Sequence, residues 1–569
     1  MTVLREFFDS YYRLRPVNAT FTGIHDHDDR LPDWSPEGLD AAIAEMRAVS
    51  ATLEAGRGDG SLGDVRTRDR ELAISFLDLQ IAEHEGPHFQ RGNPSLAAGE
   101  ATFGVISLMT RPFASAESRA EAAIGRLIAT PGFLQGATKS IANGVPDEWR
   151  TKTLRECDGA DKLLSIGIDR WITLEGFSPA LAGRLSEAAR AAQEGFAAFR
   201  NWLVGAPTAP ASRLTAGPEF FGLCLTRGHW CRRDRSELAR EAGDALEQAL
   251  SGLDARARTL SPGGWADVQQ RLTNDHPEIS DYLPAYQRAW DACRRLSQDR
   301  QLVTWPDYPI QYVPIPVQTR DAAPFLYYLF YRSPAPFDRL TSHDYVVTPI
   351  DATMSAEERQ RRLRATNNSV ITLNHVVHHG AIGHHVQNYY AYRGESEIGR
   401  VAAVDCASRI GMFLGGSMAE GWACYATDLM DECGLLTDEM SLAQQHTRAR
   451  LLARAVVDLG LHGGTLTLDQ AAAIYRDRVG MPGDAARAEV CKNSMFPATA
   501  VMYWLGTDGI HHLRREHAHE CVSLCAFHDR LLSFGSIPVP LIERVWAERP
   551  AEAIALQPSQ KGSDGARRR

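Results

Sequence analysis

Residues 375–390 read HVVHHGAIGHHVQNYY and place five of the chain's nineteen histidines within eleven positions. A single histidine on a helix is usually structural, but five in one short stretch indicate a metal or catalytic site. Gly380 and Gly383 lie between the two histidine pairs. Because glycine permits a bulge or a sharp turn, we predict a helix that is interrupted between these pairs.

The spacing of these histidines does not fit the zinc-peptidase motif His-Glu-x-x-His on an unbroken helix. Four residues after His378 stands Ile382, where that motif requires its second histidine. On a regular helix His378 and His385 would be separated by about 10 Å of rise, which is too far for one ion. An interrupted helix could instead bring His378 and His384 together.

A third ligand has to come from another segment, and Glu420 in MAEGWACYATDL is the best candidate. It lies on a segment with helical character among apolar neighbours such as Trp422. Two histidines followed by a glutamate on a later helix is the ligand order of glutamate-zincins. The alternative is a glutamate on the surface of a helix.

The composition favours a cytoplasmic protein that binds neither nucleic acid nor membrane. The 569 residues carry a net charge of −10, which argues against a polyanionic partner. The ten cysteines contain no CxxC pair, which is typical of reduced thiols in the cytosol. No uncharged apolar run reaches the roughly 18 residues of a membrane span.

Helical periodicity covers most of the chain, so the predicted fold class is mainly α. The clearest helical segments are residues 39–53, 66–85, 116–130, 151–174, 179–204 and 236–255. Residues 301–316, QLVTWPDYPIQYVPIP, combine alternating apolar residues with prolines, which favours short edge strands. We therefore predict one domain over residues 1–560, with a helical part (1–300), a small sheet region that lines the cleft (301–350) and a helical part with the metal-site motifs (351–556). Residues 557–569 are expected to form a disordered tail.

Four motifs resemble those of the domain-of-unknown-function 885 family of bacterial proteins, which itself resembles the helical glutamate-zincin metallopeptidases. The family motif His-Glu-x-x-Pro-Gly-His-His-x-Gln aligns with residues 378–387, and Glu-Gly-Trp-Ala-x-Tyr matches residues 420–425. Val-Asp-x-Gly-x-His matches residues 457–462, and the fourth motif matches Glu489, Val490 and residues 497–503. With the segments at residues 16–33, 217–221 and 304–316, the resemblance covers nearly the full chain. It implies a large helical zincin-like metallopeptidase fold.

One departure from the family pattern affects the chemistry directly. His379 stands where the family has the glutamate that would act as general base, and Ile382 replaces its proline. Loss of a positioned base typically lowers a rate by about 10²–10⁴-fold. Ordinary peptidase activity by the mechanism that the resemblance implies is therefore in question.

The residues and the resemblance together give a set of predicted site residues. The metal ligands are His378, His384 and Glu420, with His385 as the rival for the second place and Asp458 as a further ligand or a ligand-supporting residue. The catalytic residues are His379, His462 and Tyr503, of which the resemblance implies that the last two stabilise the oxyanion. Arg332 and Lys492 are predicted to anchor a substrate carboxylate.

Three functions are compatible with this set. In the first, a metallohydrolase binds zinc or another divalent ion and cleaves a peptide or small-molecule amide, with His379 or His385 as the base. In the second, hydrolysis is lost and the chain binds a ligand or a partner protein. In the third, the extra imidazole joins the metal, which suits iron, copper or nickel as well as zinc and a reaction on a small molecule.

Overall fold

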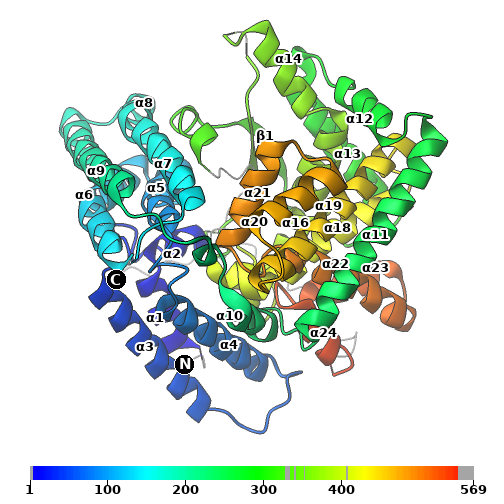
Figure 1. The fold of residues 1–569 in the computed structure, drawn as a ribbon, viewed down its shortest axis with the longest axis horizontal. Helices are drawn as coiled ribbons and strands as arrows, with labels where there is room; N and C mark the ends of the chain where they lie inside the picture. Colours follow the sequence, from blue (N-terminus) through cyan, green and yellow to red (C-terminus); the bar gives the residue numbers. More distant parts are fainter. Residues whose placement is uncertain are drawn as a thin grey trace, which may run out of the picture.

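The computed structural model describes residues 4–141, 143–326, 333–338, 341–351, 353–404 and 408–548. Within these ranges the chain is mainly helical, with a small two-stranded sheet, as the sequence predicts (Figure 1). Arg332 and the predicted tail at residues 557–569 lie outside the described residues. No described helix is long and apolar enough to span a membrane.

The α-helices of the first part of the chain are α1 (Arg5–Leu14), α2 (Pro16–Thr22), α3 (Pro36–Ala55), α4 (Val65–Glu85), α5 (Pro94–Thr110), α6 (Ala116–Ser140), α7 (Asp147–Lys162), α8 (Ile168–Glu175), α9 (Pro179–Gly205), α10 (Gly217–Leu223), α11 (Arg235–Leu260), α12 (Trp265–Asn274) and α13 (Tyr282–Asp299). Those of the second part are α14 (Ala356–Ala365), α15 (Asn368–Val370), α16 (His384–Ala391), α17 (Glu397–Val401), α18 (Gly416–Glu432), α19 (Asp438–His462), α20 (Leu468–Ala473), α21 (Gly483–Met495), α22 (Val501–His517), α23 (Leu524–Ser533) and α24 (Val539–Val545).

Two kinds of shorter helix occur beside them. The π-helical segments are η1 (Leu163–Gly167), η3 (Cys224–Gly228), η6 (Ile371–Gly380), η7 (Gly411–Gly415) and η8 (Ile474–Arg478). The 3₁₀ turns are η2 (Ala211–Leu214), η4 (Ile279–Asp281), η5 (Ala323–Phe325) and η9 (Ala518–Glu520). Because π-helical turns are rare and occur frequently at functional sites, η6 marks the histidine stretch as unusual.

The predicted helices are present, but one of them is longer than its sequence pattern indicates. The end expected before Pro131 is wrong, since α6 continues to Ser140 with this proline inside it. A proline within a helix removes a hydrogen bond and costs roughly 3 kcal/mol. At Gly195 of α9 a Cβ atom would lie 2.8 Å from the Cα of Pro131, so the two helices pack closely at this point. We attribute the continuation of α6 to this packing.

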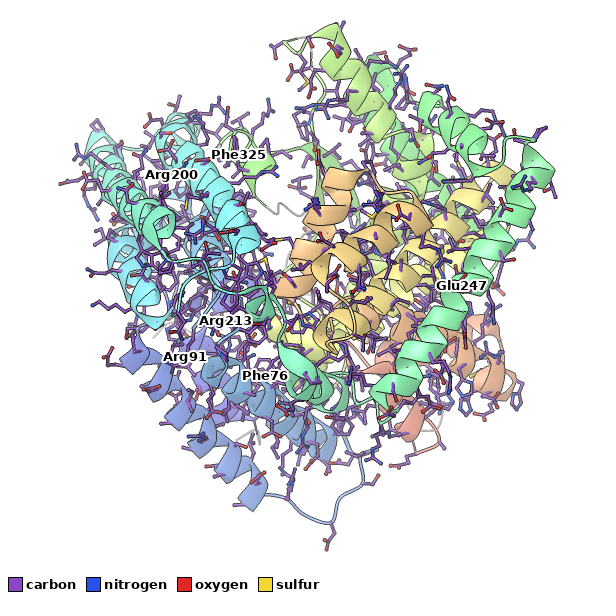
Figure 2. The ribbon with its side chains drawn as sticks, viewed as in Figure 1. Phe76, Arg91, Arg200, Arg213, Glu247 and Phe325 are labelled. Carbon is purple, nitrogen blue, oxygen red and sulfur yellow. The ribbon has the colours of Figure 1, made fainter. Side chains whose placement is uncertain are left out.

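The largest apolar core joins the two ends of the described chain. It contains Phe7 and Phe76 from α1 and α4, Trp422 from α18, and Trp546 just after α24. Phe76 is fully buried, whereas the labelled Arg200 and Glu247 have exposed side chains (Figure 2). Residues 1–300, the expected helical N-terminal part of the single domain, therefore share a core with the segment that carries the histidines.

A second core is formed by α5, α6, α7 and α9, which pack on one another as a group on the left of Figure 1. Strands β1 (Ile310–Pro314) and β2 (His343–Val347) pair in parallel, with Ile310 opposite His343. Neither strand lines the cavity described below. The sheet packs behind η6 instead, where Tyr345 places its hydroxyl 2.6 Å from Nδ1 of His375.

Candidate metal centre

The helix that carries the histidines is interrupted where the sequence predicts. The π-helical η6 ends at Gly380, Ala381 has φ −127° and ψ −116°, and α16 starts at His384. The break changes the direction of the chain, and the ring centroids of His378 and His384 lie only 4.9 Å apart. His378 and His384 are therefore brought together by an irregular turn, which an unbroken helix could not do.

Two buried tryptophans hold the turn in place. An interruption leaves backbone carbonyls without their helical partners, and a buried carbonyl needs a donor. The indole N–H of Trp290 donates to the oxygen of Gly380 at 2.9 Å, and that of Trp422 donates to the oxygen of Ile382 at 2.8 Å. Both tryptophans come from other helices, so the geometry of the turn depends on tertiary packing.

Gly383 is required in this turn because there is no room for a side chain. Its N–H donates to the carbonyl of Val377 at 2.9 Å. A Cβ atom at this position would lie 1.9 Å from the carbonyl oxygen of His378, which is backbone and cannot rotate away. Any larger residue must therefore push His378 and His384 apart.

We expect the substitution Gly383→Ala to destabilise the fold by about 1–3 kcal/mol, the usual cost of forcing an extra methyl into a packed site. It should also weaken divalent-ion binding, because both flanking histidines move. Gly243→Ala in α11 is the matched control, since a Cβ atom there meets nothing within 4 Å. Thermal unfolding and metal titration of both variants measure the effect. Wild-type values for Gly383→Ala would contradict this account of the turn.

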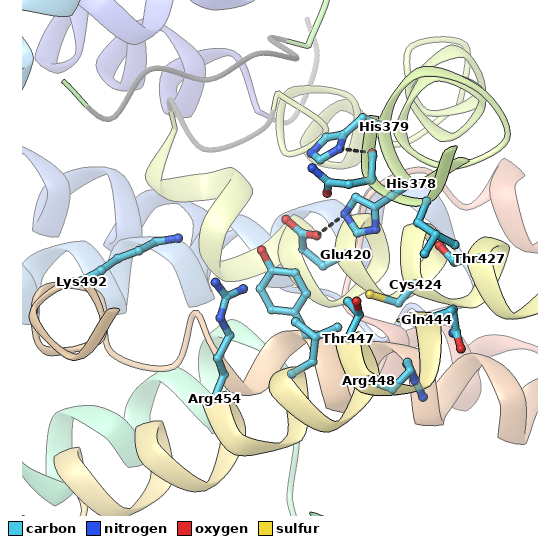
Figure 3. Close-up of a pocket in the computed structure, with 14 residues that line it drawn as sticks. His378, His379, Glu420, Cys424, Thr427, Gln444, Thr447, Arg448, Arg454 and Lys492 are labelled. Atoms are coloured by element: carbon cyan, nitrogen blue, oxygen red, sulfur yellow. Dashed lines mark hydrogen bonds and ion pairs between the residues drawn. The ribbon is translucent and has the colours of Figure 1, made fainter. Parts of the chain in front are cut away.

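Glu420 reaches the histidines from α18, which packs closely on α22. A Cβ atom at Gly421 would lie 2.5 Å from the backbone carbon of Gly506, so both positions need glycine for this approach. The side chain of Glu420 is 6% exposed, and its Oε2 lies 3.3 Å from Nε2 of His378 (Figure 3). The same oxygen lies 3.5 Å from Nε2 of His384. The carboxylate therefore faces both imidazoles in the interior of the protein.

These separations fit a shared ion. Zinc–nitrogen and zinc–oxygen bonds are about 2.0–2.2 Å long, so neighbouring ligand atoms around a tetrahedral ion are roughly 3.4 Å apart. Oε2 of Glu420 is buried and faces the imidazoles of both His378 and His384. Two imidazole nitrogens and one carboxylate oxygen that converge at ligand spacing are an arrangement that fits a metal site.

The electrostatics also favour a cation between these groups. Burial alone would raise the pKa of Glu420, but the adjacent His384 and His378 hold that pKa well below its usual range. The carboxylate is therefore ionised at neutral pH. Burial and the neighbouring His378 and His384 lower the pKa of His379 well below its usual value. His379 is thus a neutral imidazole, the form that binds metals and accepts protons.

His379 is oriented by the backbone. Its Nδ1 lies 2.7 Å from the carbonyl oxygen of Asn374. A carbonyl can only accept a hydrogen bond, so Nδ1 carries the proton and Nε2 has the lone pair. One ligand atom each from His378, His379 and His384 lie within 4.8 Å of one another. The residue that replaces the expected glutamate therefore belongs to the histidine cluster.

A cavity of about 240 Å³ opens on this cluster. Its walls come from η6, α18, α19, α21 and α22 (Figure 3). The lining residues are Leu373, Asn374, His378, His379, Glu420, Cys424, Thr427, Gln444, Thr447, Arg448, Leu451, Arg454, Lys492 and Tyr503. His378, His379 and Glu420 are thus accessible to a small ligand, while His384 is almost fully buried behind them.

His385 does not compete for the metal position in this conformation. Its Nε2 lies 2.8 Å from the carbonyl oxygen of Tyr308, and its ring stacks on that tyrosine at 5.0 Å. Adjacent residues on a helix project about 100° apart, so His384 and His385 of α16 face different neighbours. The structure therefore favours His384 over His385 as the second histidine of the site.

His462 and Asp458 lie outside the cavity, which corrects two of the predicted roles. Nε2 of His462 lies 3.0 Å from the oxygen of Asn493, and its Nδ1 accepts from the N–H of Ala216 at 3.1 Å. Burial lowers the pKa of His462 to about 4, so it is a neutral, fully buried imidazole. With both ring nitrogens bonded to the backbone, His462 has no donor for an oxyanion.

Asp458 has a comparable structural role. Its carboxylate accepts the backbone N–H groups of Ala498, Ala500 and Val501 at 2.9–3.1 Å. Asp458 belongs to α19 and is fully buried. Its carboxylate faces the turn just before the start of α22, where Ala498 has the positive φ of 61°. Asp458 therefore positions the helix that carries Tyr503, and it ligates nothing in the cavity.

Tyr503 and Lys492 line the cavity, as expected for site residues. Several residues that line the cavity were not predicted, above all Arg454, which pairs with Glu489 at 2.7 Å. Asn374 and the two bracing tryptophans were also missed. The spacing of arginines along residues 448–454 was the one local pattern that could have pointed to Arg454. The roles of Asn374 and the two tryptophans depend on contacts between distant segments.

The fold and the cluster define a class: a large helical protein with converging imidazole and carboxylate side chains at the base of a small cavity. The chain belongs to the family described as "Bacterial protein of unknown function (DUF885)", whose model matches residues 16–545. This agrees with the resemblance found in the motifs. A search of curated proteins gives no match.

Two solved structures have a similar fold. One is described as "a putative lipoprotein of unknown function from Shewanella oneidensis", with a TM-score of 0.75, 20% identity, and coverage of 96% of this chain and 99% of the other. The second is "the putative lipoprotein from Colwellia psychrerythraea", with a TM-score of 0.75, 16% identity, and coverage of 96% and 98%. At this identity the likeness concerns the fold alone.

Proposed function

We propose that this protein is a metal-dependent hydrolase that cleaves an amide bond in a peptide or a small molecule. The observation that carries the proposal is the position of Oε2 of Glu420, 3.3 and 3.5 Å from Nε2 of His378 and His384. This spacing fits zinc, and other divalent transition metals accept the same ligands. The resemblance of the family to glutamate-zincins supports the same assignment.

The residues around the cluster can divide the work of hydrolysis. A divalent ion bound by His378, His384 and Glu420 would polarise the amide carbonyl and make water a better nucleophile. His379 would take the proton from the attacking water through Nε2 and return it to the departing amine nitrogen. Tyr503 would donate a hydrogen bond to the carbonyl oxygen as negative charge develops there. Water is thereby added across the C–N bond, giving an acid and an amine.

One observation favours a second candidate. Because His379 presents a ligand atom within 4.8 Å of those of His378 and His384, the three imidazoles could bind a single ion. Such a set suits iron, copper or nickel and a non-peptidase reaction on a small molecule. A partner-binding protein without hydrolytic activity is the third possibility, and it requires no metal.

The test is elemental analysis of the purified protein, combined with hydrolysis assays on a peptide library. We expect about one divalent ion per chain and slow amide cleavage that stops on chelation and returns with added zinc. A protein that binds no ion under these conditions would refute both metal-dependent candidates. An ion without any amide cleavage would favour the second candidate.

The cellular location of the protein needs a separate test. The sequence favours a cytoplasmic protein without nucleic-acid or membrane partners, whereas both similar solved structures are described as lipoproteins. We keep the cytoplasm as the proposed location. Fractionation of the native host with antibodies against the chain distinguishes it from a membrane-attached pool.

A further inference from the structure

The cavity extends past the histidine cluster to an end that is formed by Cys424 and Thr427, which we call the thiol end. Figure 3 shows these two residues on one side of Glu420 and Lys492 on the other side. Leu373 also lines the cavity and lies five residues before His378 in the π-helical η6. Since hydrogen bonds span five residues in a π-helix, Leu373 is one turn from this histidine.

Cys424 comes from the same helix face as the predicted ligand Glu420. The two residues are four apart on α18, so their side chains lie one turn apart, about 6 Å along the helix axis. Cys424 is 4% exposed, and burial raises the pKa of its thiol to about 12. The thiol is therefore uncharged at neutral pH and behaves as a small apolar side chain.

The wall contributed by α19 is one face of that helix. Leu451 follows Arg448 by three residues and Thr447 by four, and all three line the cavity. Residues at this spacing project from the same side of a helix. Leu451 thus adds a second branched aliphatic side chain, beside Leu373, to the lining of the cavity.

The polar side chains near the thiol end are bound within the protein. Asp428 accepts a hydrogen bond from Nε2 of Gln444 and lies 3.8 Å from Arg448. The hydroxyls of Thr427 and Thr447 donate to backbone carbonyls of their own helices at 2.9 and 3.0 Å. A charged side chain that entered this end would lose its water and would have to displace one of these partners. An uncharged apolar side chain has neither cost.

The dimensions of the cavity define how large that side chain is. About 240 Å³ is below the roughly 300–1,000 Å³ of pockets that enclose drug-sized ligands, so the cavity suits about one amino-acid residue. An extended chain advances about 3.3–3.6 Å per residue. With roughly 6 Å between the turns of Glu420 and Cys424, an amide carbonyl beside Glu420 leaves the side chain of the adjoining residue at the thiol end.

We infer that the thiol end binds an aliphatic side chain, such as that of leucine, on the substrate residue next to the cleaved amide, and that Cys424 limits the size of this side chain. The position next to a cleaved bond rests on the proposed function, whereas the binding of an aliphatic side chain does not. Cys424 is then a residue that determines specificity and takes no part in the chemical step.

The binding test compares three uncharged-backbone probes by calorimetric titration of the protein as purified: N-acetyl-L-leucinamide, N-acetylglycinamide and N-acetyl-L-aspartic acid α-amide. Burial of a leucine side chain should make the first probe bind roughly 10–100-fold more tightly than the glycine probe. The aspartic probe should bind no more tightly than the glycine probe. Equal binding of the leucine and glycine probes, or tighter binding of the aspartic probe, would overturn the inference.

Two substitutions of Cys424 should shift the preference in opposite directions. Cys424→Leu fills the thiol end and is expected to reduce the preference for leucine over glycine about tenfold. Cys424→Ala enlarges it and should favour N-acetyl-L-phenylalaninamide relative to the leucine probe. Cys433→Leu, at the end of the same helix and outside the cavity lining, is the matched control and should bind as the wild type does.

Circular dichroism of each variant checks the fold, and Cys424→Ala keeps the test valid if Cys424→Leu does not fold. A purely structural role of Cys424 would weaken the binding of all probes alike. Folded variants that keep the wild-type order of the leucine, glycine and phenylalanine probes would therefore contradict the role assigned to Cys424.

Thiol labelling tests the access to this end without any cleavage. Cys293 is the matched comparison, because burial also raises the pKa of its thiol to about 12, and it does not line the cavity. Methyl methanethiosulfonate should modify Cys424 faster than Cys293, and the leucine probe should slow the modification of Cys424 alone. Labelling of Cys424 that is no faster than that of Cys293 would overturn the inference, because the cavity would then not admit even a small reagent.

The outcomes for binding and for cleavage are distinguishable. If the leucine preference follows Cys424 but no amide is cleaved, the proposed function fails and the side-chain site stands. If amides are cleaved without any preference at this position, the side-chain site is refuted and the proposed function stands.

Discussion

The substitution Glu420→Gln is expected to abolish stoichiometric metal binding while leaving the protein folded. Glutamine has the shape of glutamate, so the packing of α18 against α22 should be preserved. The amide cannot supply the anionic oxygen that faces His378 and His384 at 3.3 and 3.5 Å. Loss of a residue that merely supports a ligand typically lowers metal affinity 10–100-fold. Loss of a ligand itself should therefore lower the metal affinity at least about 100-fold.

The measurement is a zinc titration of the chelator-treated variant, together with its hydrolysis rate and its unfolding temperature. Glu432→Gln on the same helix is the matched control, because that carboxylate is 46% exposed and pairs with Arg514. The control should bind one ion as the wild type does. Normal metal content in Glu420→Gln would remove this residue from the ligand set and with it the main support for the proposed function.

The second large effect is expected when His379 is replaced. Substitution by glutamine should lower the rate of hydrolysis, whereas substitution by glutamate should not. Under the proposed function His379→Gln should lower kcat about 10²–10⁴-fold, because the side chain can no longer accept a proton. His379→Glu restores the residue type that the family has at this position, so it should recover activity to the wild-type level or above. The burial and the neighbouring imidazoles that depress the pKa of His379 make it a weaker proton acceptor than an unperturbed imidazole.

Under the proposed function both variants should retain their metal, because His379 acts as the base and not as a ligand. The metal content of the variants therefore distinguishes these two roles of His379. The two side chains have nearly the same volume, so a difference in rate between them reports the ionisable group. His379→Gln and His379→Glu that both lose the ion would identify His379 as a ligand and favour the second candidate. Full activity in His379→Gln would show that His379 is not the base. His519→Glu, at an exposed position, is the control for an added negative charge.

The sequence predicted the interruption of the helix because glycines bracket it, and glycine signals a backbone constraint that can be recognised locally. The requirement at Gly383 comes from contact with the carbonyl of His378, only five residues earlier. The tryptophans that stabilise the turn could not be predicted in this way. Trp290 donates to a carbonyl 90 residues away in the chain, and no local pattern encodes such a contact.

The roles of the other polar residues in the family-like motifs were harder to assign. Asp458 and His462 occur in a motif that resembles a family signature, which drew attention to them as site residues. In the structure their polar atoms satisfy backbone groups of Ala498, Ala216 and other distant residues. A buried polar side chain must find a partner, and whether that partner is a ligand or the backbone is decided by packing.

The sequence by itself determined the helical class and the family, and it predicted His378, His384 and Glu420 as the main ligand set. These follow from periodicity, motif order and the position of glycines, which are local properties of the chain. Tertiary structure alone decided that His384 rather than His385 faces the cluster, that His462 lies outside it, and that Arg454 and Lys492 share a cavity wall. The reason is physical: α18, α19, α21 and α22 meet only when their apolar faces pack, and the rotation of each helix then fixes which side chains point inward.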